Sequence, residues 1–239
     1  MTSIVVRTLS ERVFEIVREQ IVIGRLATDT PIRQDALAAQ LGVSKIPLRE
    51  ALARLEQEGL LVSHANRGYF VQPMSAEQVD EIYALRLTIE PAAAAHAALV
   101  ADGAARAQTA EAFERLDSAA GSNLAEVAVR NRDFHTALVR PGGRLLTTQL
   151  VERLSILAER YVVAHLQPAG RESRAHLEHR GLLDAWMARD AVTLEALLLQ
   201  HIAGTLDDLK QQFAAGTERK VRIAEFSSPS LADNRHQVR

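Results

Sequence analysis

Apolar residues recur every three to four positions through the N-terminal quarter of the chain, a spacing that predicts helices rather than strands. An apolar stripe over 10–23 indicates a first helix, and a shorter one over 34–40 indicates a second. A third helix is expected to begin at Ser44 and to end before Gly59, because serine is a favoured N-cap and glycine commonly follows a helix end. The chain is therefore expected to open with three helices.

Two short runs of strand-forming residues follow the third helix, at 61–64 and 69–72. The residues between them are predicted to form a turn, in which Gly68 is free to take a positive φ. A proline-containing linker at 73–75 then separates this part from the rest of the chain. The first domain is therefore assigned to residues 1–73, as three helices followed by a hairpin.

Every signal after the linker is helical. The second domain is assigned to residues 76–214, and the polar remainder, 215–239, is expected to be a flexible tail. Pro91 lies inside the first of these helices and is expected to kink it, because proline removes one backbone hydrogen bond. The predicted helices span 76–100, 104–120, 123–139, 143–166, 172–189 and 191–214. The fold class is therefore mainly α, with an all-helical bundle as the second domain.

The composition supports two folded domains and excludes several classes of protein. A chain of 239 residues with 47% hydrophobic residues can bury two cores, although aromatic residues make up only 4%. Because the chain has no cysteine, disulfides and thiolate metal sites are excluded, which fits a reducing compartment. No apolar run is long enough to span a membrane, and the N-terminus lacks the features of a signal peptide. A cytoplasmic protein with no membrane partner is expected.

The second and third predicted helices have the layout of a helix–turn–helix that binds DNA. A tight turn at Gly42 joins them, and Ser44 is expected to cap the third helix through its hydroxyl. Lys45 and Arg49 lie four apart near the start of that helix, away from its apolar stripe. Side chains in this position can enter the major groove, whereas the alternative is a helical hairpin with a solvated basic face. The predicted hairpin that follows favours DNA binding, because the two motifs together make a winged helix.

The charge of the chain is too low for strong DNA binding by a single copy. The net charge is −2, and residues 1–72 hold nine Lys/Arg against eight Asp/Glu. Positive charge supplies most of the sequence-independent affinity for DNA, so one such domain should bind modestly. A homodimer that binds two half-sites is therefore expected.

Three histidines occupy positions where a helical bundle would normally place apolar residues. If the last two predicted helices form an antiparallel hairpin that turns at Asp190, His179 and His201 lie equally far from the turn and can meet. Asn131 and His135 are one helical turn apart and share one side of a helix. Three imidazoles and one oxygen ligand, with open positions left, would suit a divalent metal. The alternative is that each histidine is bonded to a backbone carbonyl.

The N-terminal residues resemble a known family of transcription regulators. The stretches 42–52, 55–61 and 66–68 are similar to the winged-helix domain of the GntR family, and the likeness covers roughly residues 8–73. The resemblance implies that the protein binds double-stranded operator DNA. The residues that it implies for this contact are Arg33, Ser44, Lys45, Pro47, Arg49, Arg67 and Gly68.

The resemblance also implies how these residues act. Lys45 and Arg49 would contact bases or phosphates from the recognition helix. Ser44 and Arg33 would contact phosphate, and the wing residues Arg67 and Gly68 would enter the minor groove.

The helical part resembles the FCD branch of the same family, whose C-terminal domain is an all-helical, effector-binding bundle. The likeness covers roughly 76–212 and rests on 131–138, on 178–180 with Leu183, and on 201–202. The number of predicted helices is similar to that of the VanR-like subgroup. The resemblance implies a divalent metal, either zinc or an alternative such as nickel. The ligands that it implies are Asn131, His135, His179 and His201.

Two residues decide how the resemblance applies to this chain. The branch often has aspartate where this chain has Asn131, and a neutral amide oxygen should lower metal affinity and occupancy. Four neutral ligands would leave the positive charge of the metal uncompensated, which favours an anionic effector. Arg86 with Glu90 also matches the branch, and an arginine fork suits the carboxylate of an effector. The alternative for Arg86 is a surface ion pair with Glu90.

These observations predict a ligand-responsive transcription regulator, a repressor rather than an enzyme, that binds a small carboxylate effector near a divalent metal. One alternative is a DNA-binding protein with a structural metal and no effector, although structural zinc sites are usually closed by four protein ligands. A second alternative is a metal-dependent hydrolase. It is disfavoured because no acidic residue lies at an obvious spacing from the ligands to act as general base.

Overall fold

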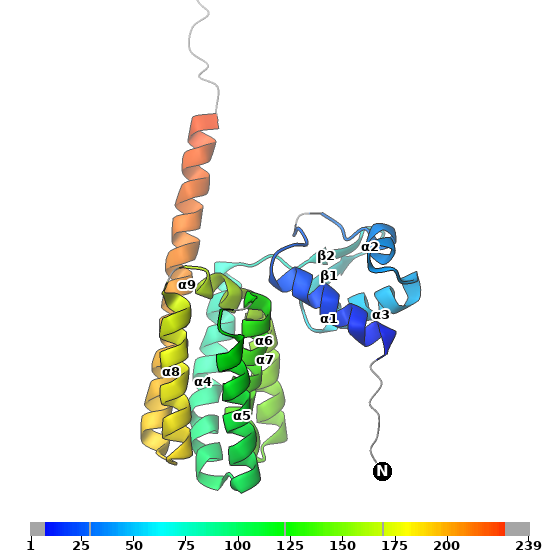
Figure 1. Cartoon of the computed structure of the whole chain (residues 1–239). Helices are drawn as coiled ribbons and strands as arrows, with labels where there is room; N and C mark the ends of the chain where they lie inside the picture. The colour runs from blue at the N-terminus through cyan, green and yellow to red at the C-terminus, as the bar shows by residue number, and fades with distance from the viewer. Residues whose placement is uncertain (1–7, 29, 122, 169, 228–239) are drawn as a thin grey trace, which may run out of the picture.

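The computed structural model describes residues 8–28, 30–121, 123–168 and 170–227, with side chains described as far as residue 215. These residues form two domains, a small N-terminal domain and a helical bundle (Figure 1). Each domain has its own hydrophobic core, one within 13–71 and the other almost entirely within 79–209. The expected fold class, mainly α with a winged helix before a helical bundle, is confirmed.

The N-terminal domain follows the expected order of elements. Its strands pair antiparallel, with Leu61 opposite Val71 and His64 opposite Gly68. Each element ends within a residue or two of its predicted bounds. The elements are α1 (Leu9–Val22), α2 (Gln34–Leu41), α3 (Lys45–Gln57), β1 (Leu61–His64) and β2 (Gly68–Val71). A helix–turn–helix followed by a β hairpin is the winged helix that the sequence predicts.

The two helix starts in this domain differ in how they are capped. At α1, the Thr8 hydroxyl accepts from the backbone of Glu11, and the Glu11 carboxylate accepts from the Thr8 N–H at 2.7 Å, which makes a capping box. At α3, Ser44 occupies the N-cap position with an extended backbone, but its side chain makes no capping hydrogen bond. The expected hydroxyl cap is therefore wrong, and the Ser44 side chain is exposed.

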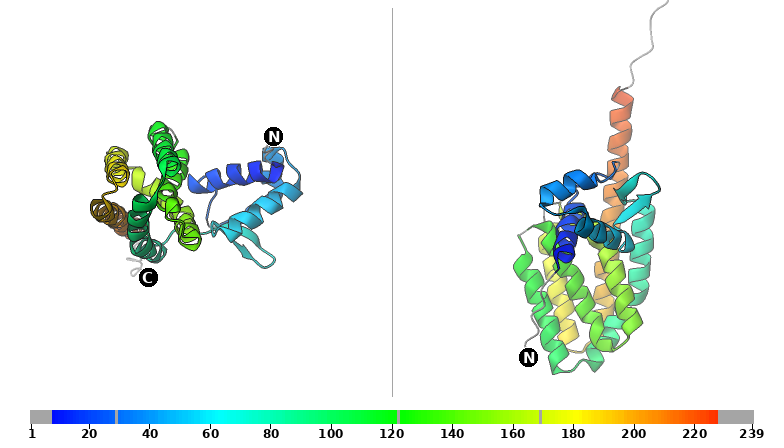
Figure 2. Two further views of the ribbon diagram at one scale, coloured as in Figure 1. Left: turned by 90° about the horizontal axis from the view of Figure 1, so that it is seen from below. Right: turned by 90° about the vertical axis from the view of Figure 1, so that its right-hand side faces the viewer.

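The helical bundle matches the expected helices closely except at the C-terminal end. Its elements are α4 (Ala76–Val100), α5 (Gly103–Ala119), α6 (Leu124–Val139), the short 3-10 helix η1 (Arg140–Gly142), α7 (Leu145–Leu166), α8 (Arg171–Met187) and α9 (Ala191–Ser227). Helix α9 continues beyond the predicted end at 214 and projects past the other helices (Figures 1 and 2). The stretch 215–227 contains no proline that would stop it. The rest of the expected tail, 228–239, lies outside the described residues.

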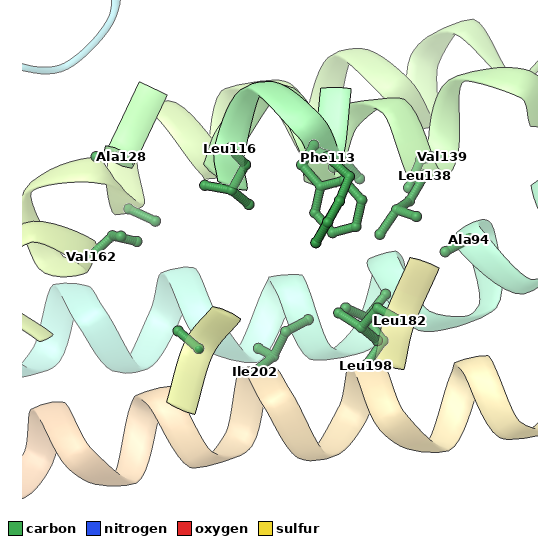
Figure 3. Packing of buried hydrophobic residues seen from close by; sticks show 14 of the residues in the cluster. Ala94, Phe113, Leu116, Ala128, Leu138, Val139, Val162, Leu182, Leu198 and Ile202 are labelled. Atoms are coloured by element: carbon green, nitrogen blue, oxygen red, sulfur yellow. The ribbon is translucent and has the colours of Figure 1, made fainter. Parts of the chain in front are cut away.

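Helix α4 is the central helix of the bundle and packs against α6, α7 and α9. It continues as one helix through Pro91. Figure 3 shows Phe113, Leu138 and Leu182 converging in the core beside it. The Trp186 Nε1–H donates to the Leu138 carbonyl at 2.9 Å, so this large buried ring leaves no unpaired donor. None of the helices in the described ranges has the length and apolar character needed to cross a membrane.

The two domains pack together along α7. Arg153 donates to the carbonyl of the last residue of α3 at 2.6 Å, and Arg160 donates to the Gln72 carbonyl just after β2. Gly59 has a φ of 74°, and a Cβ there would lie 3.0 Å from Leu157 of α7. Glycine is therefore needed at this position both for the backbone turn and for the close approach of the two domains.

Candidate metal centre and DNA-binding surface

Three histidines from three helices of the bundle meet in its interior. His135 lies on α6, His179 on α8 and His201 on α9, and their nearest ring nitrogens all lie within 4.8 Å of one another. The ring centroids of His179 and His201 are 4.7 Å apart, which confirms that the α8–α9 hairpin brings them to the same height. The separation of the three nitrogens, at most 4.8 Å, is short enough for one ion to contact all three rings.

Carboxylates lie directly behind two of the three rings. Glu90 Oε2 is 3.0 Å from Nδ1 of His135, and Glu178 Oε2 is 2.7 Å from Nδ1 of His201. A carboxylate only accepts, so both contacts favour a proton on Nδ1 and a lone pair on Nε2. At His135 the Arg86 Nη2 donor also faces Nδ1, but at 3.4 Å it lies farther away than Glu90. Carboxylate–histidine pairs of this kind orient metal ligands in proteins and raise their basicity.

The free nitrogens at the centre of the cluster are buried without partners. Among the described residues, Nε2 of His135 and Nε2 of His179 make no hydrogen bond. Buried polar atoms are almost always paired, so these two nitrogens are available to a metal ion or a water molecule. Burial lowers the pKa of His135 to about 4 and that of His179 well below its usual value. Both imidazoles are therefore neutral at pH 7 and offer lone pairs, as a divalent metal requires.

Asn131 and the other candidate residues sit around this cluster. Asn131 lies one turn before His135 on α6 and lines the same cavity as His179 and His201. His176, one turn before His179 on α8, faces Asp117 at 2.9 Å. The alternative in which the histidines bond to backbone carbonyls is wrong for His135 and His201, because their Nδ1 atoms face carboxylates.

Arg86 is committed to an ion pair inside the bundle. Its Nε donates to Glu90 Oε1 at 2.6 Å and its Nη2 donates to Glu90 Oε2 at 3.3 Å. Both side chains are buried, so the alternative of a surface pair is wrong, although the i, i+4 spacing is as expected. Burial disfavours the Glu90 carboxylate, but Arg86 and His135 outweigh this and hold its pKa at about 2. The fork of Arg86 thus already holds a carboxylate from its own helix.

Most of the side chains expected to bind DNA are exposed on the N-terminal domain. Arg33, Ser44, Lys45, Arg49 and Arg67 are all exposed. Lys45 pairs with Asp35 at 2.5 Å, and the Nε of Arg49 donates to Gln34 at 3.3 Å. These are exposed contacts between neighbouring helices, and exposed ion pairs are weak enough for phosphates to displace them.

Comparison with known families matches both halves of the chain. The model described as "Bacterial regulatory proteins, gntR family" matches residues 9–71, and the model described as "FCD domain" matches residues 81–204. The chain belongs to the GntR family of transcription regulators. Its second half is the FCD domain of this family, so the resemblance noted in the sequence is confirmed.

Full-length relatives are regulators of transcription. BphR of Paraburkholderia xenovorans, named an HTH-type transcriptional regulator, is 32% identical over 86% of this chain and 87% of its own length. The repressor GlaR of Escherichia coli K12 is 29% identical over 82% and 94%. A probable D-xylose utilization operon repressor of Paenarthrobacter nicotinovorans is 29% identical over 83% and 88%. The family therefore consists of regulators, and the expectation that the protein is not an enzyme is confirmed.

Solved structures of GntR regulators share the fold. E. coli McbR/YncC has a TM-score of 0.69 at 24% identity, covering 87% of this chain and all of that one. A putative GntR regulator from Rhodococcus sp. RHA1 has a TM-score of 0.71 at 22% identity, covering 84% and 97%.

Within the GntR winged helix, two of the residues expected to contact DNA, Pro47 and Gly68, instead shape the backbone that presents their neighbours. Pro47 is buried in the first turn of α3, so it shapes the start of the helix and does not present its ring to DNA. Asn66 and Gly68, on either side of Arg67, have positive φ angles of 61° and 85°, and this tight turn places the exposed Arg67 at the tip of the wing.

One exposed residue and two side-chain contacts around the candidate sites were not predicted from the sequence. Ile46 is 70% exposed between Lys45 and Arg49 on α3, and its signal was an apolar residue off the buried stripe of that helix. The Glu90–His135 and Glu178–His201 contacts had no usable signal, because their partners lie on different helices. These two carboxylates also correct the expectation of a wholly neutral site, since they bring negative charge next to the candidate ligands.

Proposed function

We propose that this GntR regulator is a repressor that binds operator DNA as a homodimer and leaves it when a small carboxylate binds beside a divalent metal. The observation that carries the proposal is the buried pair of unpartnered Nε2 atoms, on His135 and His179. A metal would give their lone pairs a partner, and an anionic effector would complete the shell of the ion. The repressors among the relatives support the direction of control.

Zinc is the proposed ion, with nickel as the first alternative, because neutral imidazoles suit both. Asn131 would add its amide oxygen to the three histidines. Metal analysis of protein purified without a tag or chelator, followed by zinc titration, tests this assignment. About one ion per chain supports it, whereas a protein that takes up neither zinc nor nickel would overturn the metal and leave the DNA-binding role in place.

The proposed DNA contact uses the exposed start of α3 and the tip of the wing. Lys45 and Arg49 carry the charge, and Ile46 between them can contact a thymine methyl group in the major groove. Because each copy has little excess charge, a dimer on two half-sites would be needed for tight binding. Sedimentation at low concentration should therefore give twice the mass of one chain.

A gel-shift titration on the promoter of the regulator's own gene tests these contacts. Arg49→Ala should abolish specific binding, and Ile46→Ala should weaken it about tenfold. Arg115→Ala is the matched control, because Arg115 pairs with Glu111 on α5 in the bundle, away from the winged helix. Unchanged affinity in Arg49→Ala would refute the proposed interface.

Effector release is tested by operator binding in the presence of zinc and a panel of small carboxylic acids. An acid that weakens binding by the zinc-loaded protein, but not by the chelator-treated protein, supports a metal-anchored effector. If no acid changes operator affinity, the metal serves only the structure of the bundle.

A further inference from the structure

The cavity beside the three histidines has apolar walls. Phe113, Leu116, Val127, Val162 and Leu166 line it. Figure 3 shows Phe113, Leu116 and Val162 as part of the buried packing between the helices. These side chains offer a bound molecule dispersion contacts and no hydrogen bonds.

Tyr83 adds one available hydrogen-bond donor, its hydroxyl, on the side of the cavity formed by α4. Its hydroxyl is buried and finds no hydrogen-bond acceptor among the described residues, because the nearby Arg86 guanidinium, 5.1 Å from the centre of its ring, can only donate. Burial raises the pKa of Tyr83 to about 12, so the hydroxyl keeps its proton at neutral pH and can donate it. A buried donor of this kind needs an acceptor.

Apart from the candidate metal ligands, the other polar groups that line the cavity each have a partner already. Arg86 is held in its buried ion pair, Thr205 donates to a carbonyl of its own helix at 3.0 Å, and Glu172 accepts from a backbone N–H at 2.7 Å. The Nδ1 atoms of His165 and His176 face charged partners at 3.1 and 2.9 Å. Arg86 is also the single lysine or arginine among the described residues that line the cavity.

We infer that the effector is a monocarboxylic acid with an apolar body, such as an aryl or alicyclic acetic acid, whose carboxylate lies between the metal and the Tyr83 hydroxyl. The inference rests on the function proposed above and names the class of its ligand. A sugar acid would bury several hydroxyls for which few partners are free. A dicarboxylate would bury a second charge opposite no free cation.

The test is calorimetric titration of the zinc-loaded full-length protein with four compounds: phenylacetate, its neutral amide phenylacetamide, gluconate and succinate. Phenylacetate should bind at least ten times more tightly than each of the other three, and stripping the zinc with a chelator should abolish the binding. Tighter binding of gluconate or succinate would overturn the apolar acid while leaving a metal-anchored effector intact. Failure of every acid to bind or to change operator affinity would overturn both.

Two conservative variants test the assigned contacts. Tyr83→Phe removes only the hydroxyl and should weaken phenylacetate binding at least fivefold, with zinc affinity unchanged as evidence of a folded site. Val127→Thr keeps the shape of the wall but places a hydroxyl in it, and should weaken phenylacetate binding severalfold. Val192→Thr is the matched control, because Val192 is exposed on α9 and does not line the cavity. Equal phenylacetate affinity in the two threonine variants would contradict an apolar binding wall.

Discussion

Arg18 of the winged helix and Glu159 of the bundle form an ion pair across the boundary between the two domains. Both are buried, with side chains 4% and 1% exposed. Glu159 also accepts from Arg132 at 3.0 Å, and Arg132 is the residue next to Asn131 on α6. Helix α6 therefore carries candidate metal ligands and, through Arg132 and Glu159, a contact that reaches the DNA-binding domain. This is a physical route by which events in the cavity can bias the placement of the winged helix.

Removing the charge of Glu159 should destabilise the protein and loosen the domain contact. Among the described residues, Glu159→Gln removes the nearest counter-charge of the buried Arg18, leaving only Glu58 at 3.8 Å, and it removes one of the two acidic ion-pair partners of Arg132. Breaking a buried pair in this way costs about 3 kcal/mol. Urea unfolding measures the change. Glu152→Gln, at an exposed position of the same helix, should stay within about 0.5 kcal/mol of the wild type. Equal stability of the two variants would show that the buried pair does not stabilise the domain contact.

Loss of the carboxylate behind His201 should weaken metal binding. Glu178→Gln keeps the shape of the side chain but removes the negative charge 2.7 Å from Nδ1 of His201. Changes to such outer partners typically lower metal affinity about 10–100-fold. Zinc titration against a competing chelator measures the change, and Glu195→Gln at an exposed position of α9 is the control. The role assigned to Glu178 is wrong if both variants bind zinc alike.

Restoring a carboxylate at position 131 should have opposite effects on the metal and on the effector. Asn131→Asp adds an anionic oxygen beside the three histidines, so zinc affinity should rise about tenfold. The added negative charge should also weaken binding of an anionic effector, because it lowers the net charge of the metal site. Parallel titrations with zinc and with phenylacetate measure the two effects. A rise in both affinities would contradict the electrostatic argument.

The metal-free protein should lose stability as the pH falls below about 6.5, in part because of His165. Burial lowers the pKa of His165 to about 4, so the folded state keeps it neutral while the unfolded state protonates near pH 6.5. Its contribution is present above pH 6.5 and is lost as the pH falls from 6.5 towards 4, by about 2 kcal/mol between pH 7 and pH 5.

Urea unfolding of the chelator-treated protein at the two pH values tests this prediction. The pH-dependent loss should be smaller by that amount in His165→Gln than in the wild type. A loss of the same size in both proteins would mean that His165 does not contribute to it.

Local signals in the sequence were enough to predict the winged helix and the order of the helices. The stops at Gly42 and Gly59 both coincide with positive φ angles, which glycine adopts without strain. The meeting of His179 with His201 was also predictable, because an antiparallel hairpin aligns residues that are equally far from its turn. The end of α9 was not, because a polar stretch without proline carries no clear stop signal.

The sequence by itself determined which segments are helical, which face of each is apolar, and that His179 can meet His201, because these follow from spacing along one helix or one hairpin. Only the tertiary structure decided that Glu90 stands behind His135 and that Glu178 stands behind His201, since the partners are separated by 45 and 23 positions. It also decided that the Arg86–Glu90 pair is buried inside the bundle and that Arg18 reaches Glu159. Pairs of this kind depend on how helices rotate and approach when their apolar faces pack, which no local pattern in the sequence encodes.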